Sequence, residues 1–103
     1  MVRARFIVQV RYGHFAEYLK SLEQLNEIAR ARGWAEATFW VATAGTANEL
    51  IADVDYPDLA TFDQEGQAQS SDAEWMRVIR STADMVVQGT GRTELLQTAP
   101  QLA

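Results

Sequence analysis

The sequence predicts a small α+β domain whose strands and helical regions follow the order β-α-β-β-α-β. Residues 2–12 alternate apolar and polar side chains, the period of a strand with two different faces. Residues 15–32 repeat apolar side chains every three or four positions, the period of a helix. Two segments rich in aromatic and β-branched residues then flank a glycine-centred turn at 44–47, which predicts a β-hairpin.

The first helix has signals at both ends. Gly13 breaks the chain before it, and Gly33 follows it where a left-handed cap is usual. Glu17 lies in its first turn and Arg30 and Arg32 in its last, so these charges complement the helix dipole. We therefore expect a single uninterrupted helix up to Gly33.

The second helical region is expected in two pieces. Pro57 favours a first helical position. Residues 64–71 are polar and include Gly66, so we expect a break there. Ser71 and Glu74 then match the Ser-x-x-Glu capping box ahead of a further apolar stripe. The remaining predicted elements are strands over residues 34–44, 48–56 and 89–98.

Length and composition fit one globular domain. The chain has 103 residues, of which 48% are apolar and 22% charged, with no internal linker or repeat. We expect the domain to cover residues 1–98 and a short tail to follow at 99–103.

Several classes of function do not fit this composition. Cysteine is absent, which excludes disulfides and thiolate metal sites. A net charge of −5 argues against nucleic-acid binding, which needs clustered Lys and Arg. No apolar run approaches the roughly 20 residues that span a bilayer, and no signal-peptide core is present. We therefore expect no membrane partner and, by default, a cytoplasmic location.

The element order describes a ferredoxin-like fold, a four-stranded antiparallel sheet with the helices on one face. The other face should be polar if water covers it. It instead mixes charged residues with a large apolar patch, which predicts that a second copy of the sheet covers it. The resulting homodimer would enclose a cavity of mixed polarity, the form that ligand sites take. Its expected lining is Trp40, Ile51, Ile7, Glu49 and Arg92.

Short motifs follow one another along the second half of the chain. Gly45 and Asn-Glu-Leu at 48–50 lead into a strand, Tyr-Pro-Asp-Leu-Ala-Thr-Phe follows at 56–62, and Asp-Ala-Glu-Trp at 72–75. In this order they resemble the NIPSNAP-like branch of the dimeric α/β-barrel superfamily, and the resemblance covers residues 2–94. It implies a homodimer with a central barrel and a cavity in each subunit. It does not imply one activity, because the superfamily includes cofactor-free monooxygenases, lactone isomerases, haem-handling proteins and members without an assigned reaction.

Four polar residues are candidates for catalysis. His14, the only histidine, fits a general base or axial metal ligand, but also a helix cap or solvated turn residue. Asp53 could act as a base toward an acidic C–H if an enclosed cavity raised its pKa. Arg5 or Asn48 could stabilise developing negative charge. Alternatively Arg5 pairs with the carboxylate and holds the barrel together, and Asn48 is an ordinary turn residue.

We expect no cofactor. The sequence contains no glycine-rich phosphate loop, nucleophile elbow or metal-ligand spacing. A haem protein of the superfamily would place its histidine in the helical region after the third strand, where this sequence has none.

Three functions stay open. The first is a cofactor-independent enzyme, of the monooxygenase or isomerase type, acting on a small aromatic or carbonyl-bearing metabolite. The second is a non-catalytic small-molecule-binding or stress-related protein. The third is an interaction module with a dry sheet face and no accessible pocket. Pairing of the candidate carboxylates with arginine would weaken the enzyme hypothesis, because the base would be neutralised.

Overall fold

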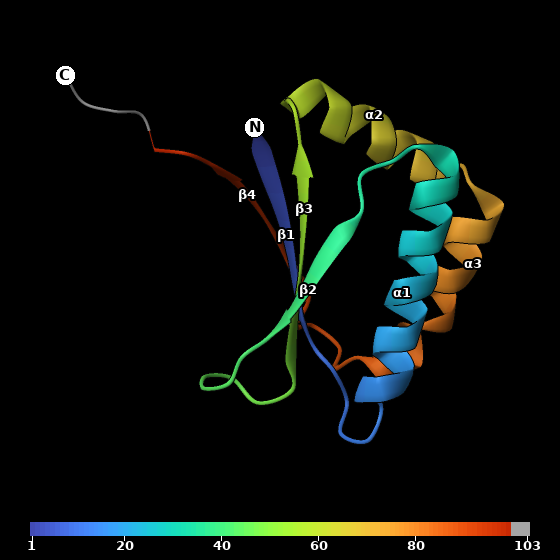
Figure 1. Cartoon of the computed structure of the whole chain (residues 1–103). Coiled ribbons are helices and arrows are strands. Elements are labelled where there is room, and N and C mark those ends of the chain that lie inside the picture. Colours follow the sequence, from blue (N-terminus) through green and yellow to red (C-terminus); the bar gives the residue numbers. More distant parts are fainter. Residues whose placement is uncertain (100–103) are drawn as a thin grey trace.

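The computed structural model describes residues 1–99; residues 100–103, most of the expected tail, lie outside the described residues. The helices and strands follow the expected order (Figure 1). They are β1 (Val2–Gln9), α1 (Phe15–Arg32), β2 (Ala37–Val41), β3 (Glu49–Tyr56), α2 (Leu59–Ser70), α3 (Ala73–Ser81), a 3₁₀ turn η1 (Ala83–Met85) and β4 (Arg92–Gln97).

The four strands form one antiparallel sheet in the order β2-β3-β1-β4. All helices lie on the same side of this sheet (Figure 1), which confirms the ferredoxin-like fold. Within the described part of the chain, no helix has the length and apolar character needed to cross a membrane.

Strand pairing confirms the expected division of residues between the two sheet faces. On the face away from the helices, here called the open face, Ile7 pairs with Ile51 and Arg92, and Ile51 pairs with Trp40. On the helix-facing side, the adjacent row contains Phe39, Ala52, Phe6 and Thr93. Alternate residues of a strand point to opposite faces, so one row serves each side.

Helix α1 covers the range expected from sequence. Gly33 ends it with a left-handed backbone at φ 75°. The Trp34 N–H then donates to the Ala29 carbonyl at 2.8 Å, which satisfies an end carbonyl of the helix. The local signals therefore sufficed to define this element.

The break in the second helical region is not where the sequence indicated. Helix α2 continues through Gly66 to Ser70, and the chain turns only at Ser71 and Asp72. Asp72, rather than Ser71, caps α3, and its Oδ1 accepts a hydrogen bond from the Trp75 N–H at 2.9 Å. A glycine costs a helix only about 1 kcal/mol, too little to end one whose neighbours continue it.

All four strands are shorter than expected, because the residues at their ends bond to side chains or belong to loops. Beyond β1, Val10 forms only an isolated bridge to Val86. Before β2, the Ala35 N–H donates to the Glu65 carboxylate at 2.8 Å instead of to a strand. Before β4, Gly89 turns the chain with a φ of 80°.

The core is divided into two clusters. Helix α2 packs on β1 and β3, where Phe62 meets Tyr56 in an edge-to-face contact at 5.4 Å between ring centroids. Helices α1 and α3 instead pack against each other, with Leu25 and Val78 buried between them. Two of the three helices are therefore joined to each other more closely than to the sheet.

We expect Gly66→Ala to raise the free energy of unfolding by about 0.5–1 kcal/mol, because alanine suits a helix interior better than glycine. A Cβ atom added at Gly66 would meet no atom within 4 Å. Denaturant unfolding measures the change. Gly33→Ala is the matched control: it should destabilise, because its φ of 75° disfavours a side chain. A loss of stability in Gly66→Ala would contradict the continuous path of α2 through this position.

Candidate functional site

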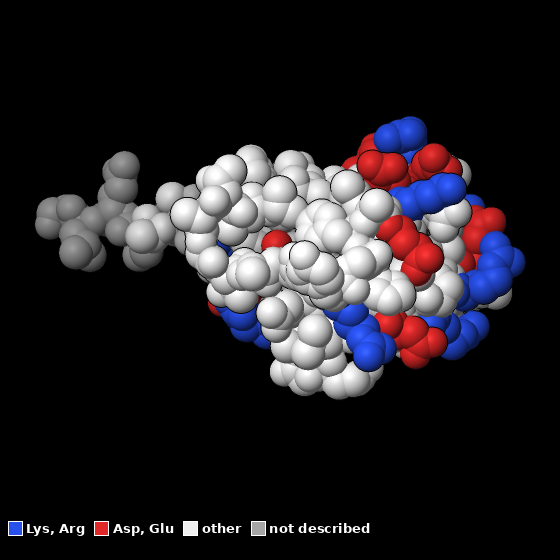
Figure 2. Space-filling model, turned by 90° about the horizontal axis from the view of Figure 1, so that it is seen from below, with Lys and Arg blue, Asp and Glu red and all other residues white. Residues whose placement is uncertain are grey.

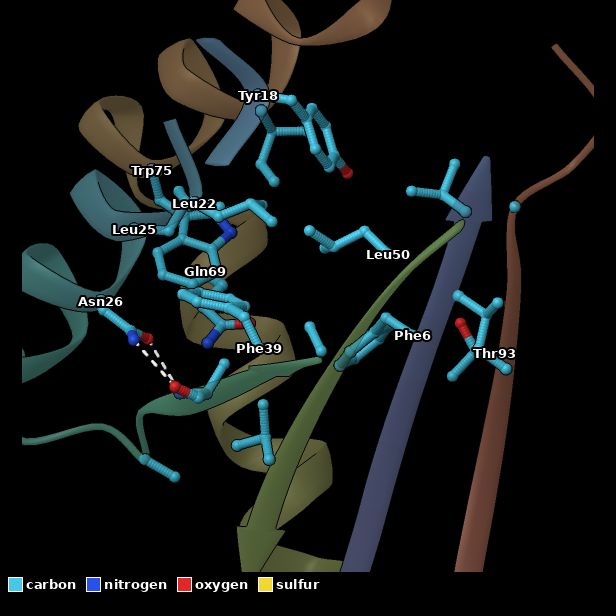
Figure 3. A pocket seen from close by; sticks show the side chains of 18 of the residues that line it. Phe6, Tyr18, Leu22, Leu25, Asn26, Phe39, Leu50, Gln69, Trp75 and Thr93 are labelled. Carbon is cyan, nitrogen blue, oxygen red and sulfur yellow. Dashed lines mark hydrogen bonds between the residues drawn. The ribbon is translucent and has the colours of Figure 1, made fainter. Parts of the chain in front are cut away.

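A cavity of about 570 Å³ lies between the sheet and the helices (Figure 3). The sheet supplies Phe6, Phe39 and Ala52 to its lining, and the helices supply Leu22 and Trp75, among others. The lining is therefore mostly apolar and partly aromatic, the composition typical of small-molecule sites.

The cavity exists because the helix layer does not settle fully onto the sheet. Small side chains at Ala35, Ala37 and Ala52 leave room on the sheet side. Phe6 and Leu95 point toward the helices, yet 40% and 49% of their surfaces remain exposed. The helices thus leave β4 uncovered, and the cavity opens to solvent along that edge.

Three polar side chains of the helices reach the cavity: Tyr18 and Asn26 from α1, and Gln69 from α2 (Figure 3). The Asn26 amide is occupied structurally: its Nδ2 donates to the Ala37 carbonyl at 2.9 Å, and its Oδ1 accepts from the Ala37 N–H at 2.8 Å. It therefore ties α1 to the start of β2 and sets the cavity wall.

The cavity has little charge. Burial raises the pKa of Tyr18, and burial, with a smaller contribution from the Glu65 charge, raises the pKa of Tyr56 to about 12. Both phenols are therefore neutral at pH 7. Arg92 is the only Arg, Lys, Asp, Glu or His among the lining residues of the described chain, and its side chain is 56% exposed. Its Nε lies 3.6 Å from a Glu94 carboxylate oxygen.

All five residues expected to line a cavity belong by register to the open face of the sheet. Ile7 and Arg92 also border the cavity described above, whereas Trp40, Ile51 and Glu49 do not. Trp40 and Ile51 belong to the open face, on the other side of the sheet. Enclosure of a second cavity at that face by a partner stays a prediction.

Asp53 and Arg5 lie together on the open face. Asp53 is 95% buried, because 5% of its surface is exposed, and it accepts bidentate hydrogen bonds from Arg5 Nε and Nη2 at 2.9 and 3.1 Å. Arg3 Nη1 lies 3.8 Å away. The Arg5 hydrogen bonds lower the Asp53 pKa. A general base at neutral pH needs a raised pKa, so this pairing weakens Asp53 as a catalytic base.

His14 and Asn48 occupy turns. His14 precedes α1, makes no side-chain capping bond, and places Nδ1 3.5 Å from Glu17 Oε1. Asn48 has a left-handed backbone at φ 57°, the conformation in which turn asparagines are common. Asn48 and Glu49 line a separate hollow of about 340 Å³ beside the β2–β3 hairpin. None of the four candidate catalytic residues lines the large cavity.

The sequence interpretation missed the polar residues that do line it. Tyr18 and Asn26 fall four residues before and after Leu22, on the stripe that α1 turns toward the sheet. Polar members of an otherwise apolar stripe are the signal that could have identified them. Trp75 packs edge-to-face against Trp34, with 5.6 Å between the ring centroids, and also lines the cavity. Among residues 1–99, no group of three His, Cys, Asp or Glu side chains is placed to hold a metal ion.

We expect Asp53→Asn to lower the free energy of unfolding at pH 7 by about 1.5–3 kcal/mol, the range for a hydrogen bond to a charged group. Because the Asp53 pKa lies below its ordinary value of 3.8, the pair stabilises the folded state above about pH 4 and loses this contribution as pH falls further. The difference between the two proteins should therefore shrink below pH 4 in urea unfolding. Asp55→Asn, in the exposed pair with Arg3, is the control and should lose less. Equal losses in both variants would contradict the assignment.

No protein-family model matches the sequence, and no curated protein sequence matches it. Among solved structures, a NIPSNAP domain protein from Burkholderia xenovorans has a TM-score of 0.79 at 16% identity, covering 100% of this chain and 99% of that one.

Two further structures are similar over nearly the whole chain. A NIPSNAP family protein from Agrobacterium tumefaciens has a TM-score of 0.78 at 18% identity, covering 95% of this chain and 92% of that one. An antibiotic biosynthesis monooxygenase has a TM-score of 0.73 at 14% identity, covering 97% and 100%. Identities this low show a shared fold and not a shared activity. The chain therefore has the ferredoxin-like fold found in NIPSNAP proteins and antibiotic biosynthesis monooxygenases, as its motifs indicated.

Proposed function

We propose that this protein binds a small, largely apolar, ring-containing molecule in the cavity between the sheet and the helices. The single observation that carries the proposal is the cavity itself. Its volume of about 570 Å³ falls within the range of roughly 300–1,000 Å³ typical of ligand sites. Aromatic rings at Phe6, Phe39 and Trp75 offer flat surfaces to such a ligand. The cavity also argues against the dry interaction module, which predicts no accessible pocket.

Cofactor-independent catalysis on a small aromatic or carbonyl-bearing molecule is the second candidate. The likeness to an antibiotic biosynthesis monooxygenase favours it. No carboxylate or imidazole belongs to the cavity lining in the described residues, so a substrate would have to be acidic enough to lose its proton to water. Tyr18 could then donate a hydrogen bond to the resulting oxyanion. Oxygen consumption that follows ligand addition would favour this candidate, and saturable binding without turnover would favour the binding protein.

We also propose that the protein is a homodimer joined through the open face. Trp40 and Leu96 remain 53% and 37% exposed there, which is costly for large apolar side chains. The buried charge on this face is already compensated within one subunit, by the Asp53–Arg5 pair. A second copy can therefore cover the face without leaving Asp53 unpaired. Figure 2, a view from below, shows a further group of charged side chains over the helices.

Filling the cavity should abolish binding of a neutral apolar probe. Ala52→Phe places a ring in the cavity between Phe6 and Phe39, so we expect the affinity for N-phenyl-1-naphthylamine to fall at least about tenfold, as measured by the fluorescence of the probe. Ala31→Phe, at an exposed position of α1, is the control and should bind like the wild type. Wild-type affinity in a folded Ala52→Phe protein would place the probe elsewhere.

A charge on the open face should separate the subunits. We expect native mass spectrometry and sedimentation to show a wild-type dimer, and Trp40→Glu to shift it to monomer, because the interface would then bury an unpaired carboxylate. Val41→Glu is the matched control: Val41 is the next residue, is 56% exposed, and points to the opposite face, so its dimer should persist. A wild-type monomer at micromolar concentration would contradict the proposed interface.

A further inference from the structure

The structure also bears on the chemistry of the ligand. We propose that the cavity selects an uncharged, elongated ligand that carries a hydrogen-bonding group at each end, one paired with the Tyr18 hydroxyl and the other with the Gln69 amide. This inference rests on the proposed function, namely that a small molecule occupies this cavity. It assigns the two residues a role in specificity.

Tyr18 and Gln69 enter the cavity at separate places, from different helices. Tyr18 lies in the first turn of α1, which begins next to the turn after β1, and Gln69 lies near the end of α2, at the other end of the sheet (Figure 1). Figure 3 shows the same separation, with Gln69 beside Phe39 and nearer to Asn26 than to Tyr18. The eight residue steps from Tyr18 to Asn26 span about 12 Å along a helix axis. A ligand that reaches both groups is therefore longer than a single ring.

Both groups have hydrogen-bonding capacity to spare. In residues 1–99 neither side chain is among the hydrogen-bonded partners, whereas Asn26 is committed to Ala37 in both directions. No fully buried side-chain nitrogen or oxygen in the described chain lacks a partner, so these two groups reach water in the open cavity. A ligand that displaced this water without replacing its hydrogen bonds would incur a desolvation penalty.

The two groups can recognise different neutral partners. The Tyr18 hydroxyl stays protonated at neutral pH, because burial raises its pKa, and can therefore donate to a carbonyl or hydroxyl oxygen. The Gln69 amide can donate and accept at once, which suits a hydroxyl or amide on the ligand. Both pairings involve neutral groups on both sides.

A charged ligand fits poorly. Arg92 supplies the only formal charge among the lining residues in the part of the chain that the structure describes, and it stands at the exposed β4 edge beside Glu94. An ionised group placed deeper in the cavity would lose its hydration without gaining a countercharge. The interior therefore selects against carboxylates and amines of the same shape.

Three probes of matched shape test this inference by isothermal titration calorimetry: 2,6-dihydroxynaphthalene, naphthalene and naphthalene-2,6-dicarboxylate. We expect the dihydroxy compound to bind tightest and the dicarboxylate weakest. Tyr18→Phe and Gln69→Leu should each weaken the dihydroxy compound about three- to tenfold, the usual effect of one neutral hydrogen bond, and leave naphthalene unchanged. Tyr18→Phe keeps the ring, so its fold and cavity shape should persist, which circular dichroism checks.

The outcomes separate this inference from the proposed function. Binding of naphthalene with no selective effect of either substitution, or tightest binding of the dicarboxylate, would overturn the inference and leave the binding site standing. Equal weakening of naphthalene and the dihydroxy compound would show that the residues act on cavity shape, which also overturns it. No binding of any probe to the wild type would overturn the proposed function and this inference together.

Discussion

The packing of α1 against α3 is the constraint on which the candidate site depends. Leu25, Ile28 and Val78 bury one another between these helices, and Trp34 closes the pair by an edge-to-face contact with Trp75. Because each helix buries much of its apolar stripe against the other, neither has to pack closely against the sheet. The helix layer is attached mainly at one end, and the space left between the layers is the cavity.

Two contacts hold that attached end. Phe62 of α2 packs on Tyr56 at the end of β3, and Asn26 of α1 holds the backbone of Ala37 at the start of β2. The Asn26 contact also supplies an edge strand with hydrogen bonds that it would otherwise take from water. The cavity therefore has a fixed wall at one end and an opening along β4, a shape that admits a ligand without unfolding the layer.

The open face of the sheet is organised around an ion pair. Arg5 and Asp53 sit directly across from each other on β1 and β3, so the strand register itself forms their bidentate pair. This pairing stabilises the sheet and, by lowering the Asp53 pKa, weakens Asp53 as a base at neutral pH. In our account, the open face serves for assembly and the helix-facing side of the sheet serves for ligand binding.

Sequence patterns within single elements predicted most of the fold. They did not predict the cavity, which depends on the spacing between the helices and the sheet. The ends of α1 carry their own signals in Glu17, Arg32 and Gly33, so its range could be predicted residue by residue. Alternation along β1 and β3 placed Arg5 and Asp53 on one face for the same reason. The helix break predicted near Gly66 was wrong, because a single glycine only weakens a helix.

The position of the cavity had no comparable signal. Its volume depends on how far α1 and α3 stand from the sheet, and this distance results from the contacts between the helices, not from the period of either one. The open face drew attention because Trp40 and Ile51 looked out of place in water. A polar residue on a helix usually faces solvent, so Gln69 carried no signal, and the only signal for Tyr18 was its place on the apolar stripe of α1.

The central claim is that the ligand site lies between the helices and the sheet. Intermolecular nuclear Overhauser effects between naphthalene protons and assigned methyl groups test it most directly. Our account predicts contacts with Leu22, Leu50 and Val54, which line the cavity. Contacts confined to Ile51 and Leu96, on the open face, would contradict it and would move the site to the other side of the sheet.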